Sequence, residues 1–251
     1  MNQGGAQFRS FPFKGMVKKL VIINLVVWIG FQMILGKLVF GVSGDITTTL
    51  GLIPALVVQK FHIWQMFTYM FLHSFDVMHI LFNMLLLWWI GSELEDLWGS
   101  RFFLKYYLVC GVGAAFIYTV GYLIYGLITG NMQALVTPVV GASGAVFGLL
   151  LAYGIYFSER TIYFMMIFPM KAKHFVYLLG GIEILWMISG GQGGVANLAH
   201  LGGLVSGFAF LMLATRWKRK TKAKSKRSSG PKLRLVVDND KSDDDGPRYW
   251  N

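Results

Sequence analysis

A serine and a histidine in two separate apolar segments are the residues of this sequence best suited to covalent chemistry. Ser143 stands in Gly-Ala-Ser-Gly at residues 141–144, and His200 stands in Ala-His-Leu-Gly-Gly at residues 199–203. A serine hydroxyl is a weak nucleophile until a base accepts its proton, and histidine, with an unperturbed pKa of about 6.5, suits that exchange near neutral pH. Because an idle ionisable group is costly in an apolar segment, the pair predicts nucleophilic hydrolysis inside a membrane.

The predicted reaction needs hydrogen-bond donors for the negative charge that develops on the attacked carbonyl oxygen. His79 and Asn83 are four residues apart, so on a helix they share a face and lie about 6 Å apart along the axis. Their side chains form one part of the predicted oxyanion site. The other part is backbone: Gly141, Ala142 and the N–H of Ser143 at a helix start, where the helix dipole favours negative charge.

Packing is expected to orient the imidazole of His200. No acidic residue accompanies His200 in its own helix, so the pattern predicts a Ser-His dyad. Phe147 follows Ser143 by four residues on the same helix face, and it is the predicted platform on which the imidazole stacks.

Composition indicates which elements must position these residues. The chain of 251 residues is 55% hydrophobic and 14% charged, with a mean hydropathy of +0.55, and its apolar blocks are long enough to span a bilayer. Hydropathy predicts an all-α polytopic membrane protein with six spanning helices, at residues 16–38, 77–91, 101–129, 143–158, 173–189 and 196–217. The apolar segment Ile162–Met170 is too short to span and contains Pro169, so we expect a buried or interfacial connector there.

The charge distribution orients the chain in the membrane. The formal net charge is +11, and twelve basic and five acidic residues between Arg216 and Asn251 account for seven of these charges. Since the rest of the chain is nearly balanced, nucleic acid is not an expected partner, whereas membrane lipids are. With six spans, most other basic residues fall on the side of both chain ends, which the positive-inside rule makes cytoplasmic. The expected location is the inner membrane or plasma membrane.

Three regions are expected along the chain. Residues 1–15 form a cytoplasmic segment, residues 16–217 form the six-helix domain, and residues 218–251 form a basic, then acidic, cytoplasmic tail that is predicted to be disordered. Cys110 is the sole cysteine, which excludes an intrachain disulfide and a thiolate metal cluster. No metal and no cofactor are expected.

Glycines indicate how two of the helices approach each other. His200, Gly203 and Gly207 share one face of the last helix, while Gly144 and Gly148 form a small-xxx-small pair on the fourth. Ordinary packing of membrane helices explains these glycines as well as a special role does, and the two interpretations are compatible. Close approach at these positions would bring the serine and the histidine within hydrogen-bond range.

Four motifs together resemble a known family. They are His-Ile-Leu-Phe-Asn at 79–83, Glu-Asp-Leu-Trp-Gly-Ser at 95–100, Gly-Ala-Ser-Gly at 141–144, and Ala-His-Leu-Gly-Gly at 199–203 with Gly207. In this order and spacing the chain resembles bacterial rhomboid intramembrane serine proteases over nearly the whole membrane body. The resemblance implies a six-helix bundle in which Ser143 is the nucleophile and His200 the general base. His79 and Asn83 would assist the oxyanion, and the substrates would be transmembrane proteins cleaved in or near a membrane segment.

Two positions depart from the family pattern. Members often have Trp-Arg before the second helix, where this chain has Trp64-Gln65, so the loop-holding role of that arginine has no direct counterpart. The residue that stacks on the histidine is often tyrosine and here is Phe147, which keeps the ring and loses the hydroxyl.

Several alternatives stay open on sequence alone. A non-hydrolytic rhomboid-like protein would bind membrane clients with the same fold, but such proteins typically lack the serine or the histidine. A proton-coupled transporter could use intramembrane His and Glu residues, but the sequence shows no internal repeats. Glu183, inside the fifth predicted helix, is open to a functional role or to a simple bond with a polar neighbour. Glu95 is expected to tie a cytoplasmic loop, and His73 to make a structural hydrogen bond.

Overall fold

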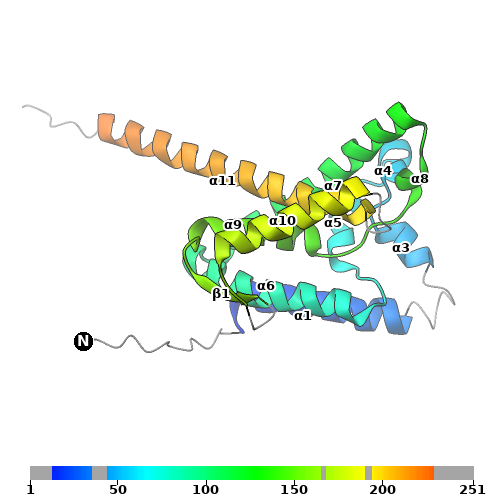
Figure 1. The fold of residues 1–251 in the computed structure, drawn as a ribbon, viewed down its shortest axis with the longest axis horizontal. Coiled ribbons are helices and arrows are strands. Elements are labelled where there is room, and N and C mark those ends of the chain that lie inside the picture. Colours follow the sequence, from blue (N-terminus) through cyan, green and yellow to red (C-terminus); the bar gives the residue numbers. More distant parts are fainter. Residues whose placement is uncertain (1–12, 36–43, 165–167, 190–193, 229–251) are drawn as a thin grey trace, which may run out of the picture. The chain divides into compact units, whose positions relative to one another are not determined.

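The computed structural model describes residues 13–35, 44–164, 168–189 and 194–228 (Figure 1). Contacts divide the chain into two units, residues 1–212 and 213–251. The elements, in chain order, are α1 (Gly15–Val26), the π-helix η1 (Val27–Leu35), α3 (Gly44–Leu50), α4 (Pro54–Lys60), α5 (Gln65–Thr68), the 3-10 helix η2 (Tyr69–Phe71), α6 (Val77–Trp98), α7 (Ser100–Thr129), α8 (Gln133–Val136), α9 (Ser143–Tyr156), β1 (Thr161–Phe164), β2 (Phe168–Lys171), α10 (Ala172–Ser189) and α11 (Gly194–Ser228).

The chain is an all-α multi-pass membrane protein, as its hydropathy predicts. By length and composition, four helical segments among the described residues can cross a membrane: Gly15–Ile34, Val77–Trp98, Ser100–Thr129 and Ala196–Arg216. The two other predicted spans correspond to α9, with 14 residues, and α10, with 18 residues. The helices are therefore consistent with the expected six.

Two helices extend beyond their predicted ends. α6 continues to Trp98, seven residues past Gly91, which is where its apolar block was predicted to end. The helix ends at Gly99, whose φ is +76°. α11 continues through Ser228, so residues 218–228, which were predicted to be disordered, are helical. Lys and Arg are good helix formers, so a basic segment can prolong a helix that began in an apolar block. Residues 229–251 of the predicted tail lie outside the described residues.

The predicted connector at residues 162–170 is instead an antiparallel hairpin of β1 and β2. Tyr163 pairs with Pro169, and Ile162 pairs with Met170. A two-stranded sheet consists only of edge strands, where proline is tolerated. Ile162 is buried, whereas Tyr163 and Phe168 are largely exposed. The apolar composition of this segment therefore reflects alternating strand faces. The buried or interfacial connector expected here is a hairpin that is buried on one side only.

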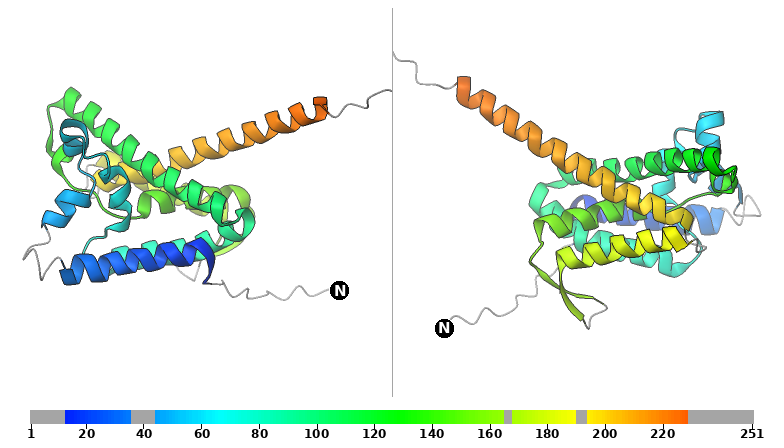
Figure 2. Two further views of the ribbon diagram at one scale, coloured as in Figure 1. Left: turned by 180° about the vertical axis from the view of Figure 1, so that it is seen from behind. Right: turned by 45° about the horizontal axis from the view of Figure 1, so that its top comes forward.

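Helix α9 lies against three other helices of the first unit. It contacts α6, α7 and α10, and Figures 1 and 2 show it alongside α10. Aromatic side chains of α7 fill the interior: Phe103, Tyr106 and Tyr107 are all fully buried. The buried Tyr106 hydroxyl donates to the carbonyl oxygen of Gly148 at 2.7 Å, which satisfies that hydroxyl in an apolar interior. The start of α9 is thus held on a rigid helical support.

The side chains of Gln65 and Trp64 bond to the backbone of the segment between the first two predicted spans. Gln65 is buried; its Oε1 accepts the N–H of Ile53 at 3.0 Å, and its Nε2 donates to the carbonyl of Thr48 at 2.7 Å. The Trp64 indole N–H donates to the carbonyl of Thr49 at 2.9 Å. An amide carries both a donor and an acceptor. Gln65 therefore holds this loop at the position where family members often have arginine.

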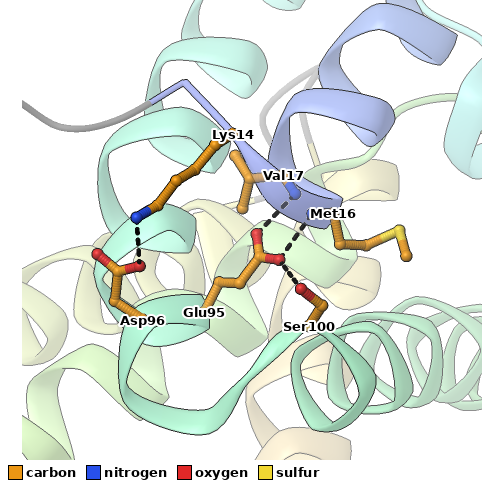
Figure 3. Close-up of polar contacts among 6 residues, drawn as sticks. All are labelled: Lys14, Met16, Val17, Glu95, Asp96 and Ser100. Carbon is orange, nitrogen blue, oxygen red and sulfur yellow. Dashed lines mark hydrogen bonds and ion pairs between the residues drawn. The ribbon is translucent and has the colours of Figure 1, made fainter.

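Glu95 fixes the start of α1 (Figure 3). Its carboxylate accepts the backbone N–H of Met16 at 2.6 Å and that of Val17 at 2.8 Å, and it also accepts the hydroxyl of Ser100. The first N–H groups of a helix have no partner within the helix, so Glu95 serves as a cap from a distant part of the chain. The predicted tying role of Glu95 is confirmed.

Candidate active site

Ser143 and His200 lie within hydrogen-bond distance, although 57 residues separate them along the chain. The Nε2 atom of His200 is 2.8 Å from the Oγ atom of Ser143. Ser143 is the first residue of α9, and His200 lies in the second turn of α11. The chain enters α9 through Gly141, whose φ of +131° favours glycine. This entry directs the Ser143 hydroxyl toward α11.

The glycines lie where the two helices meet. A Cβ atom on Gly203 would collide with the backbone carbonyl of Gly144. One on Gly148 would lie 3.2 Å from the carbonyl oxygen of Gly203, and one on Gly207 would lie 3.3 Å from the Cα atom of Gly148. Side chains larger than hydrogen would separate α9 from α11. The distance between the serine and the histidine therefore depends on this contact between backbones.

The imidazole of His200 is held on two sides. The Phe147 ring stacks on it with centroids 4.4 Å apart and planes 7° apart, the arrangement expected from the sequence. The second contact was not expected: Oε1 of Glu183, in α10, lies 3.0 Å from Nδ1 of His200. The ring is therefore not oriented by packing alone, because a carboxylate from a neighbouring helix also faces it.

His79 directs a donor toward the same place. Its Nδ1 accepts the backbone N–H of Ser74 at 3.3 Å and lies 2.8 Å from the Ser74 hydroxyl. A neutral imidazole whose Nδ1 accepts a hydrogen bond carries its proton on Nε2. A Cβ atom on Gly141 would lie 3.0 Å from that Nε2 and 3.5 Å from Oγ of Ser143. The space that a side chain at residue 141 would occupy is thus bordered by an imidazole N–H and by the Ser143 hydroxyl.

The backbone donors are at the first turn of α9. The first bond that closes this helix runs from the N–H of Val146 to the carbonyl of Ala142 at 3.0 Å, so the preceding N–H groups have no partner within the helix. The N–H of Gly141 donates to the carbonyl of Tyr69 at 3.0 Å. The N–H of Gly141 is therefore already occupied, and Gly141 contributes space and backbone conformation. The N–H of Ser143 has no partner within the helix, so it is the better candidate to donate to an oxyanion.

Asn83 supports His79 from one turn deeper. It is buried, and its Nδ2 donates to the carbonyl oxygen of His79 at 2.8 Å. An amide nitrogen has two N–H groups, so a second donor is left for other partners. The bond from Asn83 to His79 stabilises the first turns of α6.

Comparison with known proteins decides the family. Residues 60–217 match the Rhomboid domain family. This chain belongs to the rhomboid family. Over 227 residues it is 30% identical to rhomboid protease GlpG from Salmonella newport, Salmonella heidelberg and Salmonella typhimurium, and each alignment covers 86% of this chain and 72% of the relative. The matched domain of this rhomboid contains His79, Asn83, Ser143 and His200.

Glu183 is the residue that sequence analysis did not bring to this site. The available signal was its position as a carboxylate in an apolar helix, where charged groups often act in function. Its partner could not be inferred, because α10 and α11 are separate helices and sequence does not fix their relative rotation. In this rhomboid the two side chains are both mostly buried, with 14% of Glu183 and 17% of His200 exposed.

His73 lies beside the site without joining the Ser143 contact. Its backbone N–H donates to Oε1 of Gln32 at 2.9 Å, and Nε2 of Gln32 donates to the carbonyl of His73 at 2.8 Å. The imidazole is buried, with its centroid 5.3 Å from that of His79. Burial, together with the nearby His79, lowers the pKa of His73 to about 3. This histidine is therefore neutral at physiological pH. The structural hydrogen bonds that support the loop before α6 are made by its backbone with Gln32, and not by its ring.

Proposed function

We propose that this rhomboid is an intramembrane serine protease that hydrolyses peptide bonds in or near transmembrane segments of its substrates. The observation that carries the proposal is the 2.8 Å contact between Oγ of Ser143 and Nε2 of His200 in a membrane-helix bundle. The relatives named rhomboid protease GlpG support the same reaction. No metal or cofactor takes part in the proposed steps.

The proposed reaction proceeds in two halves. Oγ of Ser143 attacks the peptide carbonyl carbon while its proton passes to Nε2 of His200, and the carbonyl π electrons move to the oxygen. The Nε2–H of His79 and backbone N–H groups of the first turn of α9 stabilise this oxyanion. When the intermediate collapses, the C–N bond breaks and the leaving amine takes the proton from His200. Water then repeats the sequence on the acyl-enzyme and releases Ser143.

The proposed substrates are membrane proteins whose helix is weakened near the site. A stable helix hides its carbonyls in its own hydrogen bonds, so Gly, Pro or polar residues should favour cleavage. The excess of basic residues on one side supports cytoplasmic termini in an inner or plasma membrane. Ser143 would then lie near the opposite, outer face, and the cut should fall toward the outer end of the substrate segment.

The test is cleavage of a reporter with one glycine-containing transmembrane segment by purified enzyme in liposomes. Ser143→Ala and His200→Ala should each lower turnover by at least about 10⁴-fold, and the double variant should be no worse, because each residue needs the other. Fragment masses should place the cut at the outer end of the segment.

Matched substitutions outside the site are the controls. Ser206 bonds to the carbonyl of Gly202 at 2.8 Å, and His174 is exposed, so Ser206→Ala and His174→Ala should retain activity. Cleavage by Ser143→Ala at more than about 1% of the wild-type rate would contradict the proposed nucleophile. A cut at the inner end would contradict the proposed orientation.

A further inference from the structure

The two ring nitrogens of His200 face two different side chains. Nε2 lies 2.8 Å from Oγ of Ser143, and Nδ1 lies 3.0 Å from Oε1 of Glu183. The imidazole is thus placed between a hydroxyl on α9 and a carboxylate on α10, while Phe147 covers one ring face. These three contacts come from two helices that are separate from α11, and together they define the ring's position.

A hydrogen bond between Nδ1 of His200 and Glu183 would decide which nitrogen of the neutral ring carries the proton. An ionised carboxylate can only accept hydrogen bonds, so its partner nitrogen must be the one that carries hydrogen. If Nδ1 is protonated, Nε2 presents its lone pair to Ser143 and can accept the hydroxyl proton. The reverse tautomer would direct an N–H at the hydroxyl, and that ring could not serve as a base.

The contact between His200 and Glu183 is close but not fully aligned. The N–O separation is that of an ion pair, but Nδ1 and the carboxylate are not aligned as a hydrogen bond. Glutamate has three side-chain torsions, so its carboxylate can turn toward Nδ1 on an unchanged helix backbone. Catalytic hydrogen bonds are often poorly aligned without substrate and tighten in the complex.

We infer that Glu183 is a positioning residue that holds His200 in the proton-accepting tautomer and stabilises the imidazolium that forms during attack. This inference rests on the proposed function and deepens it, because it makes the Ser143–His200 pair a triad with a carboxylate from α10. The imidazolium gains a negative partner at 3.0 Å in surroundings that exclude most water. Its described contact is with His200, so the proposed action of Glu183 is through that ring.

Three substitutions test the role. Glu183→Gln preserves size and removes the charge, Glu183→Ala removes the contact, and Glu183→Asp keeps the charge on a shorter side chain. In the same liposome assay, the Gln and Ala variants should lower kcat at least about tenfold, toward the roughly 10⁴-fold loss known for neutralised triad carboxylates. KM should stay within about twofold, because substrate binding does not involve this carboxylate. The Asp variant should be faster than the Gln variant.

A second readout measures the serine directly. The rate constant for inactivation by a fluorophosphonate reports the nucleophilicity of Ser143, and it should fall in the Gln variant by about the same factor as kcat. Thermal unfolding midpoints identify variants that merely fold poorly. The matched control is Glu93→Gln, which removes a carboxylate that pairs with Arg160 and should leave kcat unchanged.

The outcomes separate this inference from the proposed function. If Ser143→Ala is inactive while Glu183→Gln and Glu183→Ala keep wild-type kcat, the positioning role is wrong and the dyad stands. A loss that appears only in KM or in the unfolding midpoint also overturns the positioning role. Activity in Ser143→Ala would overturn the proposed function itself, whatever the Glu183 variants do.

Discussion

Glu95 and Glu183 are both shielded carboxylates in helices of the same unit, yet they face different kinds of partner. Glu95 accepts two backbone N–H groups at the start of α1 and the hydroxyl of Ser100 (Figure 3). Glu183 faces one ring nitrogen of His200 at 3.0 Å. Backbone amides do not titrate, so the bonds of Glu95 are the same throughout any reaction. An imidazole can carry one or two protons, so the partner of Glu183, unlike that of Glu95, can change its charge during a reaction.

From this difference we expect one carboxylate to act on stability and the other on reaction rate. A carboxylate that satisfies helix N–H groups lowers the free energy of the folded state, and its loss leaves buried donors unpaired. A carboxylate beside a general base lowers the free energy of the transition state relative to the ground state, and its loss appears in kcat. Substitutions at the two ends of the bundle should therefore change different measured quantities.

The largest loss of kcat expected in this comparison is from His79→Ala, at the end of the bundle that holds Ser143 and His200. The change removes the Nε2–H donor that faces Gly141 and Ser143, and loss of one oxyanion donor costs about 10²–10³-fold in kcat, or about 3–4 kcal/mol. The unfolding midpoint should change little, because the ring's bond is to the nearby Ser74. Steady-state cleavage and thermal unfolding in the same detergent measure both quantities. A kcat within about threefold of wild type would remove His79 from the oxyanion site.

The opposite result is expected from Glu95→Ala. The N–H groups of Met16 and Val17 would lose their acceptor. An unsatisfied buried donor costs about 1–3 kcal/mol, and the Met16 donor is only partly buried, so the unfolding free energy should fall by about 2–4 kcal/mol. The kcat per folded molecule should stay at the wild-type value. The control is Asp96→Asn, since its 3.7 Å pair with Lys14 is exposed and should contribute less than about 1 kcal/mol. If Glu95→Ala slowed kcat as strongly as Glu183→Gln does, the two carboxylates would not differ as proposed.

Local sequence patterns were sufficient for the features that depend on one helix at a time. Apolar blocks predicted an all-α membrane fold, whose helices are consistent with six spans. The i, i+4 spacing placed Phe147 against the ring of His200. Close packing at Gly144 and Gly203 followed from small residues on helix faces, and it brings Ser143 to His200.

Features that depend on how separate elements face each other were missed. The contact between Glu183 and His200 requires a particular rotation of α10 against α11, and nothing in either segment specifies it. The hairpin of β1 and β2 was missed because short apolar runs do not distinguish a strand from a connector. Gln65 was treated as the loss of an arginine, whereas its amide bonds to the loop backbone in both directions.

The smallest effect expected is a pH dependence of the unfolding free energy from His73, a buried ring that lies next to His79. Its folded pKa is about 3, lowered mainly by burial, while an unfolded histidine has a pKa of about 6.5. Between these values the unfolded chain binds a proton that the folded chain does not, so this contribution weakens the fold as pH falls below about 6.5. From pH 7 to pH 5 the loss should be about 1–2 kcal/mol. His73→Asn should remove that part of the loss, and unfolding free energies of both proteins at the two pH values measure it. Carboxylates elsewhere contribute equally to both proteins, so an identical pH dependence in the variant would show that His73 is charged in the folded protein or is not buried as described.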